Sequence, residues 1–195
     1  MVPGGALPEA ADLGETEVTI YVGGLHVADE PTVIRTLLGS CVSVCLWDPV
    51  TRVGGMNHFM LPRSTAPEVE GDALRFGVHA MDRLIGTMMK LGAARRRLVA
   101  KVFGGAHVLA LRTSSESVAE QNVRFVRGFL RDEGIPVAGE DLGGDHARHV
   151  RFYTASGRAL VRRISSAAAL ARLALRERRA EAAPPASGDV VLFEA

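Results

Sequence analysis

The chain has 195 residues, of which 47% are hydrophobic and only 5% aromatic. This length and composition predict a single domain whose core consists mainly of aliphatic side chains. The 23 basic and 22 acidic residues nearly cancel, leaving a formal net charge of +1. A protein whose main task is binding nucleic acid needs a basic face, so we do not expect a nucleic-acid-binding protein.

The chain has no run of about 18 consecutive apolar residues, so we expect no membrane insertion. Residues 1–15 contain acidic side chains and neither lysine nor arginine, unlike a secretory signal. On one strand, at about 3.3 Å per residue, Cys41 and Cys45 would lie roughly 13 Å apart, beyond the ~7 Å that a disulfide spans. Two reduced thiols are typical of the cytoplasm, which is the expected location.

The first half of the chain is predicted to be mainly extended. Alternating apolar residues indicate a half-buried strand over residues 17–27. Further extended segments are predicted over residues 33–38, 41–47 and 54–61. A turn begins at Asp48 and joins the last two into a hairpin. This hairpin would place Cys41 and His58 on adjacent strands, at the ends far from the turn.

Two helices are predicted in the second half. The first covers residues 74–91, with its buried face formed by Leu74, Val78, Met81, Ile85 and Met88. The second covers residues 117–132, with Ala119, Val123, Val126 and Leu130 on one face, and ends at Gly134. Short strands are predicted over residues 98–103, 135–138, 150–153 and 159–164. This order favours an α+β fold, a single layered domain of mixed β-sheets with helices packed outside.

The composition divides the chain into three parts. Residues 1–15 are expected to be a flexible N-terminal tail. Residues 16–165 hold the predicted strands and helices and form the folded domain. Residues 166–195 are rich in alanine and arginine and are expected to be a C-terminal helix and tail.

The candidate chemistry lies in the segment from Thr36 to Cys41 and in His58. A thiol is nucleophilic as the thiolate, and a neighbouring imidazole can accept its proton and hold the resulting ion pair. Thr36 could orient the ring of His58 by accepting its second N–H. Amide N–H groups at Gly39 and Ser40 could stabilise an oxyanion, a contribution of about 3–4 kcal/mol per donor.

Spacing alone favours a core role for Cys41 over a catalytic one, because cysteine is among the most often buried residue types. Cys45 is predicted to be core. Glycine pairs precede four histidines, at residues 26, 58, 107 and 146, and could indicate a metal site. Their intervals are irregular, and His146 and His149 lack a further ligand at suitable spacing, so we expect glycine turns and no metal.

The same residues resemble the chemoreceptor glutamine deamidase family, CheD. The resemblance covers residues 18–164 and rests on residues 38–48, 54–62, 102–106, 121–123 and 140–144, followed by Arg148. Its most specific part is Gly-Ser-Cys at residues 39–41 followed by His-Phe-Met-Leu-Pro at residues 58–62. The resemblance implies a catalytic domain similar to that of deamidating bacterial toxins. It also implies a protein-glutamine glutaminase in the cytoplasm that needs no cofactor.

The resemblance implies that glutamine side chains of methyl-accepting chemotaxis receptors are converted to glutamate, with release of ammonia. Cys41 matches the family's nucleophile, His58 its histidine and Thr36 its threonine. Many members also bind the phosphatase CheC, and some act on receptor methyl esters. Because the substrate side chain projects from a long helix, we expect a shallow groove that is open to a protein surface.

Two other functions remain compatible with the sequence. One is a non-catalytic adaptor that binds chemoreceptors or a chemotaxis phosphatase. The other is a thiol hydrolase that acts on small amides or esters. Conversion of receptor glutamines, binding without conversion, and turnover of free glutamine would distinguish the three.

Overall fold

A computed structural model describes residues 16–62, 67–107 and 117–164. The predicted tail at residues 1–15 and the predicted helix and tail at residues 166–195 lie outside the described residues. No helix in the described part of the chain is long and apolar enough to cross a membrane.

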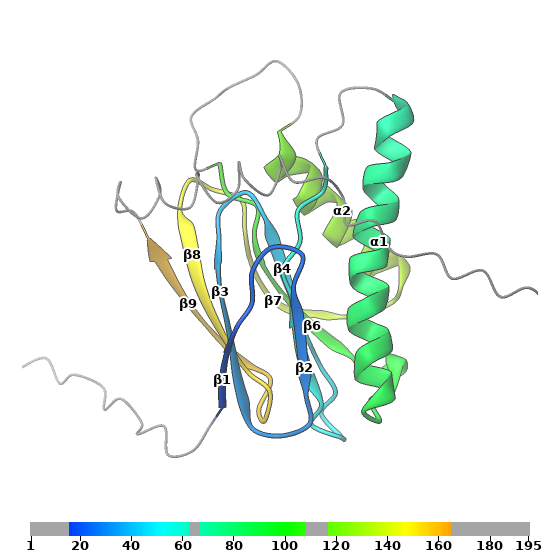
Figure 1. Cartoon of the computed structure of the whole chain (residues 1–195), viewed down its shortest axis with the longest axis vertical. Coiled ribbons are helices and arrows are strands. Elements are labelled where there is room, and N and C mark those ends of the chain that lie inside the picture. Colours follow the sequence, from blue (N-terminus) through cyan, green and yellow to red (C-terminus); the bar gives the residue numbers. More distant parts are fainter. Residues whose placement is uncertain (1–15, 63–66, 108–116, 165–195) are drawn as a thin grey trace, which may run out of the picture.

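Two β-sheets form the centre of the molecule (Figure 1). The four-stranded sheet has the order β1-β3-β8-β9, with β1 parallel to β3 and the other pairs antiparallel. Its strands are β1 Thr16–Thr19, β3 Thr32–Leu38, β8 Ala147–Tyr153 and β9 Arg158–Ile164. The five-stranded sheet has the order β2-β5-β4-β6-β7. Its strands are β2 Leu25–Ala28, β4 Val42–Trp47, β5 Gly54–Asn57, β6 Val99–Gly104 and β7 Val137–Leu142.

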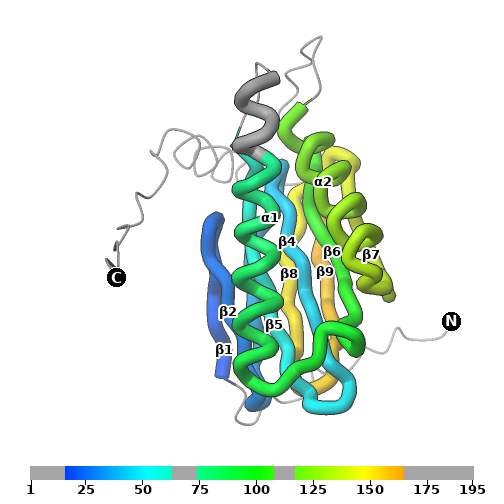
Figure 2. The backbone as a smooth tube through the Cα atoms, turned by 90° about the vertical axis from the view of Figure 1, so that its right-hand side faces the viewer, coloured from blue at the N-terminus to red at the C-terminus, as the bar shows by residue number. Residues whose placement is uncertain are grey.

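The helices cover one face of the five-stranded sheet, and the four-stranded sheet covers the other (Figure 2). They are α1 Pro67–Lys90 and α2 Val118–Asp132, with a short 3-10 helix at Arg95–Arg97. Ser117 caps α2 and forms a capping box with Glu120, each residue accepting from the backbone N–H of the other. The predicted α+β class with mixed sheets and outer helices is therefore confirmed.

Strand β4 contributes to both cores because its side chains alternate between the two faces of the sheet. Val42, Val44 and Leu46 pack towards the helices, against residues such as Met81 and Leu130. Cys45 packs in the core between the two sheets, as does Cys41 just before the strand; this core also contains Ile34, Leu38, Met56, Val150 and Phe152. The hairpin of β4 and β5 is antiparallel, as predicted, and pairs Cys45 with Met56.

Several elements differ in extent from the sequence predictions; α1 begins at Pro67 and β8 at Ala147, both earlier than predicted. The predicted strand over residues 17–27 is two strands in different sheets, because the chain turns between Tyr21 and Gly24. On α1, the predicted buried residues Met81, Ile85 and Met88 are buried, together with Leu84, whereas Leu74 and Val78 are 43% and 40% exposed. The strand expected at residues 135–138 begins two residues later and continues to Leu142. Each prediction identified a periodic segment but misplaced its turn or end.

Candidate active site

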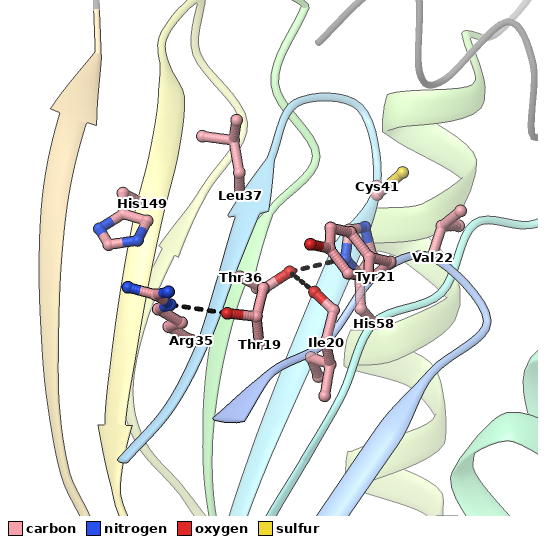
Figure 3. Close-up of a pocket in the computed structure, with 10 residues that line it drawn as sticks. All are labelled: Thr19, Ile20, Tyr21, Val22, Arg35, Thr36, Leu37, Cys41, His58 and His149. Carbon is pink, nitrogen blue, oxygen red and sulfur yellow. Dashed lines mark hydrogen bonds between the residues drawn. The ribbon is translucent and has the colours of Figure 1, made fainter. Parts of the chain in front are cut away.

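A pocket of about 230 Å³ lies at one end of the two sheets, where β3, β4 and β5 come together. It is lined by Thr19, Ile20, Tyr21, Val22, Arg35, Thr36, Leu37, Cys41, His58 and His149. Figure 3 shows these side chains. Of the five residues predicted for the site, Thr36, Cys41 and His58 line the pocket. Gly39 and Ser40 precede Cys41 in the chain but are not among the lining residues.

The loop that carries Cys41 is fixed by its carbonyl groups. The carbonyl of Cys41 accepts from the N–H of Gly105 at 2.8 Å, and that of Gly39 accepts from the N–H of Ala106 at 2.7 Å. Gly104 has φ of +113°, and a Cβ at this position would lie 2.1 Å from the carbonyl oxygen of Cys41. Only glycine permits this conformation and this close approach.

Asn122 of α2 connects the two segments that carry Cys41 and His58. Its amide nitrogen donates to the carbonyl of Ser40 at 2.9 Å, and its amide oxygen accepts from the N–H of Leu61 at 2.8 Å. The side chain is completely buried. Leu61 follows His58 by three residues, so this amide fixes one segment relative to the other.

The backbone of His58 continues the pairing of β5 with the start of β2. Its N–H donates to the carbonyl of Gly24 at 2.9 Å, and its carbonyl accepts from the N–H of Gly23 at 2.7 Å. The turn from Tyr21 to Gly24, which the sequence prediction missed, therefore packs against the imidazole-bearing residue. The adjacent glycines at residues 23 and 24, inside a strand-like pattern, were the available signal for this turn.

The hydrogen bonds of Thr36 determine the tautomer of His58. The hydroxyl of Thr36 donates its single proton to the carbonyl of Ile20, with an O–O distance of 2.9 Å. The same oxygen lies 2.8 Å from Nδ1 of His58, so it must accept a proton from Nδ1. In the neutral ring, Nε2 then carries the lone pair. Nε2 is buried and has no hydrogen-bond partner in the structure.

The side chains of Cys41 and His58 are both buried. Cys41 is 2% exposed and His58 is 6% exposed. Burial lowers the pKa of His58 to about 4, so its ring is neutral at pH 7. The expectation of a shallow, open groove is therefore wrong: the thiol and the imidazole lie at the inner end of a pocket. A neutral imidazole next to a thiol can accept the proton of that thiol.

Cys45 lies in the core between the sheets and does not line the pocket. Its side chain is 1% exposed, and burial raises the pKa of its thiol well above the usual range. The prediction that Cys45 is a core residue is confirmed. Neither cysteine forms a disulfide.

The rim of the pocket contains residues that the sequence did not single out. Tyr21 and Val22 are exposed at 60% and 38%, and they lie in the missed turn. Arg35 and Leu37 of β3 and His149 of β8 form another part of the lining. These three side chains come from the outer face of the four-stranded sheet, whereas Thr36 points to its inner face.

The pocket thus holds a buried thiol and a neutral, hydrogen-bonded imidazole, the two kinds of side chain that a cysteine hydrolase uses. The sequence profile described as "CheD chemotactic sensory transduction" matches residues 60–163. The chain belongs to this CheD family.

Relatives with the printed name "Probable chemoreceptor glutamine deamidase CheD" match nearly the whole chain. The Rhizobium leguminosarum bv. trifolii protein is 46% identical over 90% of this chain and 95% of its own. The Agrobacterium fabrum protein is 47% identical over 90% of this chain and 96% of its own. The Xanthomonas campestris pv. campestris protein is 46% identical over 86% of this chain and 84% of its own.

Proposed function

We propose that this chain is a protein-glutamine deamidase that converts glutamine side chains of chemoreceptors to glutamate and releases ammonia. The observation that carries the proposal is the hydrogen-bond chain from Ile20 through Thr36 to His58, which leaves Nε2 as the basic atom in the pocket that Cys41 lines. Membership of the CheD family and the printed names of the relatives support chemoreceptors as the substrate.

In the first half-reaction the sulfur of Cys41 attacks Cδ of the substrate glutamine while Nε2 of His58 takes the thiol proton. The C–N bond then breaks, and His58 returns the proton to the leaving nitrogen, which departs as ammonia. In the second half-reaction His58 accepts a proton from water, and the resulting hydroxide cleaves the thioester. The proton returns to Cys41, and the product is the side chain of glutamate.

Proton transfer from Cys41 belongs to the attack step in this proposal. The sequence predicts a standing thiolate–imidazolium pair, but a pKa of about 4 keeps His58 neutral before substrate binds. Bound substrate removes water from the pocket and brings the amide carbon to the sulfur, so that proton transfer and bond formation proceed together. Thr36 is a positioning residue, since it acts on the substrate only through the orientation of His58.

Gly39 and Ser40 are proposed to supply backbone N–H groups for the oxyanion of the tetrahedral intermediate. Their support is the fixed direction of the neighbouring carbonyls, which are bonded to Ala106, Asn122 and Gly105 on the side of α2 and β6. A preorganised donor is worth about 3–4 kcal/mol in the transition state.

Mass spectrometry of a receptor cytoplasmic fragment, incubated with the full chain, tests the proposal. We expect conversion of specific glutamines to glutamate, equimolar ammonia, and loss of both with Cys41→Ala in a protein that remains folded. Full conversion by Cys41→Ala would exclude Cys41 as the nucleophile. Binding of the fragment without any conversion would instead support the adaptor, and comparable turnover of free glutamine would support a small-amide hydrolase.

The phosphatase CheC is a further proposed partner, and co-purification of CheC with the full chain tests this proposal.

A further inference from the structure

The outer face of the four-stranded sheet carries a group of arginines. Side chains of a strand alternate between the faces, so the neighbours of buried Thr36 and Val150 along the chain point outwards. The outward basic positions are Arg35 on β3, His149 and Arg151 on β8, and Arg158 and Arg162 on β9. We call the four arginines the arginine face. It lies on the opposite side of the molecule from α1 and α2, so neither helix covers it (Figure 1).

The strand register brings these side chains close together. Arg35 lies directly across from Arg151, and His149 directly across from Arg162. Like charges at directly opposed positions, as at Arg35 and Arg151, destabilise a sheet. The pKa of His149 is lowered, first by burial and then by the charges of Arg162, Arg35 and Arg151. This shift indicates a positive potential at the face.

Acidic side chains balance little of this charge. Among the outward positions of the four described strands, Glu17 is the one carboxylate, and it pairs with Arg35 at 2.7 Å. Arg151 and Arg158 lie over the ring of Tyr153, at 5.9 and 5.5 Å from its centre, which orders their guanidinium groups.

The arginine face is continuous with the pocket. Arg35 and its neighbours Leu37 and His149 line the pocket together with Cys41 and His58 (Figure 3). A protein segment that places a glutamine side chain in the pocket therefore extends over this face. A segment bearing carboxylates would relieve the repulsion between the arginines.

We propose that the arginine face binds an acidic stretch of the protein substrate that adjoins the glutamine to be converted. The inference rests on the proposed function, and it adds a rule for substrate choice: glutamines flanked by acidic residues bind best. A protein segment fits better than an anionic membrane because only a partner that carries the amide can use the pocket and the face at once.

The test is binding of a receptor cytoplasmic fragment to full-length protein carrying Cys41→Ala, so that no turnover occurs. We expect the combined substitution Arg158→Glu and Arg162→Glu to raise the Kd about tenfold at low salt, because attractive rim charges become repulsive. The Kd of the otherwise unchanged protein should also rise steeply with salt, and that of the double variant much less.

Arg131→Glu on α2 is the matched control, since this arginine is 77% exposed and lies on the side of the helices. The Kd of this variant for the fragment should stay unchanged. Equal Kd values for the double variant and the control, with both proteins folded, would overturn the inference. The inference would also be overturned if the double variant lost binding to phosphatidylglycerol vesicles but still bound the fragment, because the arginine face would then bind lipid.

Conversion of the fragment by protein with Cys41 intact is measured in parallel. If conversion occurs but the double variant binds and converts normally, the inference fails and the proposed function stands. If no conversion occurs although binding depends on the arginines, the proposed function fails.

Discussion

The side-chain amide of Asn122 donates to the backbone carbonyl of Ser40, 82 residues away in the sequence. The same amide accepts from Leu61, so one helix residue determines the separation of the segments that carry the thiol and the imidazole. Both interactions of Asn122 are hydrogen bonds between an uncharged amide and the backbone. The relationship makes α2 part of the site, although this helix does not line the pocket.

Asn122→Ala is expected to lower the free energy of unfolding by about 2–4 kcal/mol, because two buried backbone groups lose their partners. The rate of deamidation should fall further than the unfolded fraction explains, since Cys41 and His58 are no longer held in register. Urea unfolding and turnover of a receptor fragment measure the two effects. Arg131→Ala on the same helix serves as the control. A variant with full activity per folded molecule would contradict the positioning role.

Thr36→Val keeps the size of the side chain and removes the acceptor for Nδ1 of His58. We expect kcat/KM to fall about a hundredfold, in the range that a positioned general base contributes. Thr36→Ser retains the hydroxyl and should restore most of the activity. If valine and serine behaved alike, the hydroxyl would have no role in orienting the ring.

The stability of the protein should depend on pH through His58. Its pKa is about 4 in the folded protein and 6.5 ordinarily, so the unfolded chain takes up a proton first as the pH falls. Burial of neutral His58 therefore makes the free energy of unfolding depend on pH. Its contribution, about 3 kcal/mol, is fully present above pH 6.5 and is lost as the pH falls towards 4.

Chemical denaturation between pH 7 and pH 4 measures this dependence. His58→Gln should flatten the curve, and His149→Gln, at a more exposed position, should flatten it less. Equal slopes for His58→Gln and the unchanged protein would show that burial of the ring is not maintained in solution.

The two cysteines should react differently with iodoacetamide. Cys41 lines a pocket that a small reagent can enter, and the neutral imidazole of His58 in that pocket can accept the thiol proton during attack on the reagent. The thiol of Cys45 has a raised pKa and lies in a closed core. We expect label on Cys41 in the native protein and on both cysteines in urea, as determined by peptide mass spectrometry. Cys41→Ser should leave the native protein unlabelled. Native labelling of Cys45 would mean that the inter-sheet core opens readily.

Local patterns in the sequence predicted the hairpin of β4 and β5 because both strands are short, apolar and joined by a turn at Asp48. That hairpin alone is enough to bring Cys41 towards His58. The prediction for the buried face of α1 is confirmed at Met81, Ile85 and Met88 and wrong at its first two residues, because periodicity does not tell how far along a helix the packing against a sheet extends. Leu74 and Val78 are exposed for this reason.

The hydrogen-bond partners in the site could not be predicted in the same way. An asparagine on the apolar face of α2, between Ala119 and Val126, indicates a buried polar role. Its partners Ser40 and Leu61 are distant in sequence, and only the packing of α2 on the sheet brings them together. The carbonyl of Ile20, which sets the tautomer of His58, lies just after β1 and has no side-chain signal.

The absence of a side chain at Gly104 has a consequence for protein engineering. A methyl group there would collide with the carbonyl of Cys41, so the wall behind Cys41 tolerates no side chain at this position. Tyr21 and Val22, on the opposite rim, project into solvent. Mutant libraries that aim to retarget the enzyme to new glutamines should therefore diversify that rim and leave the glycine wall untouched.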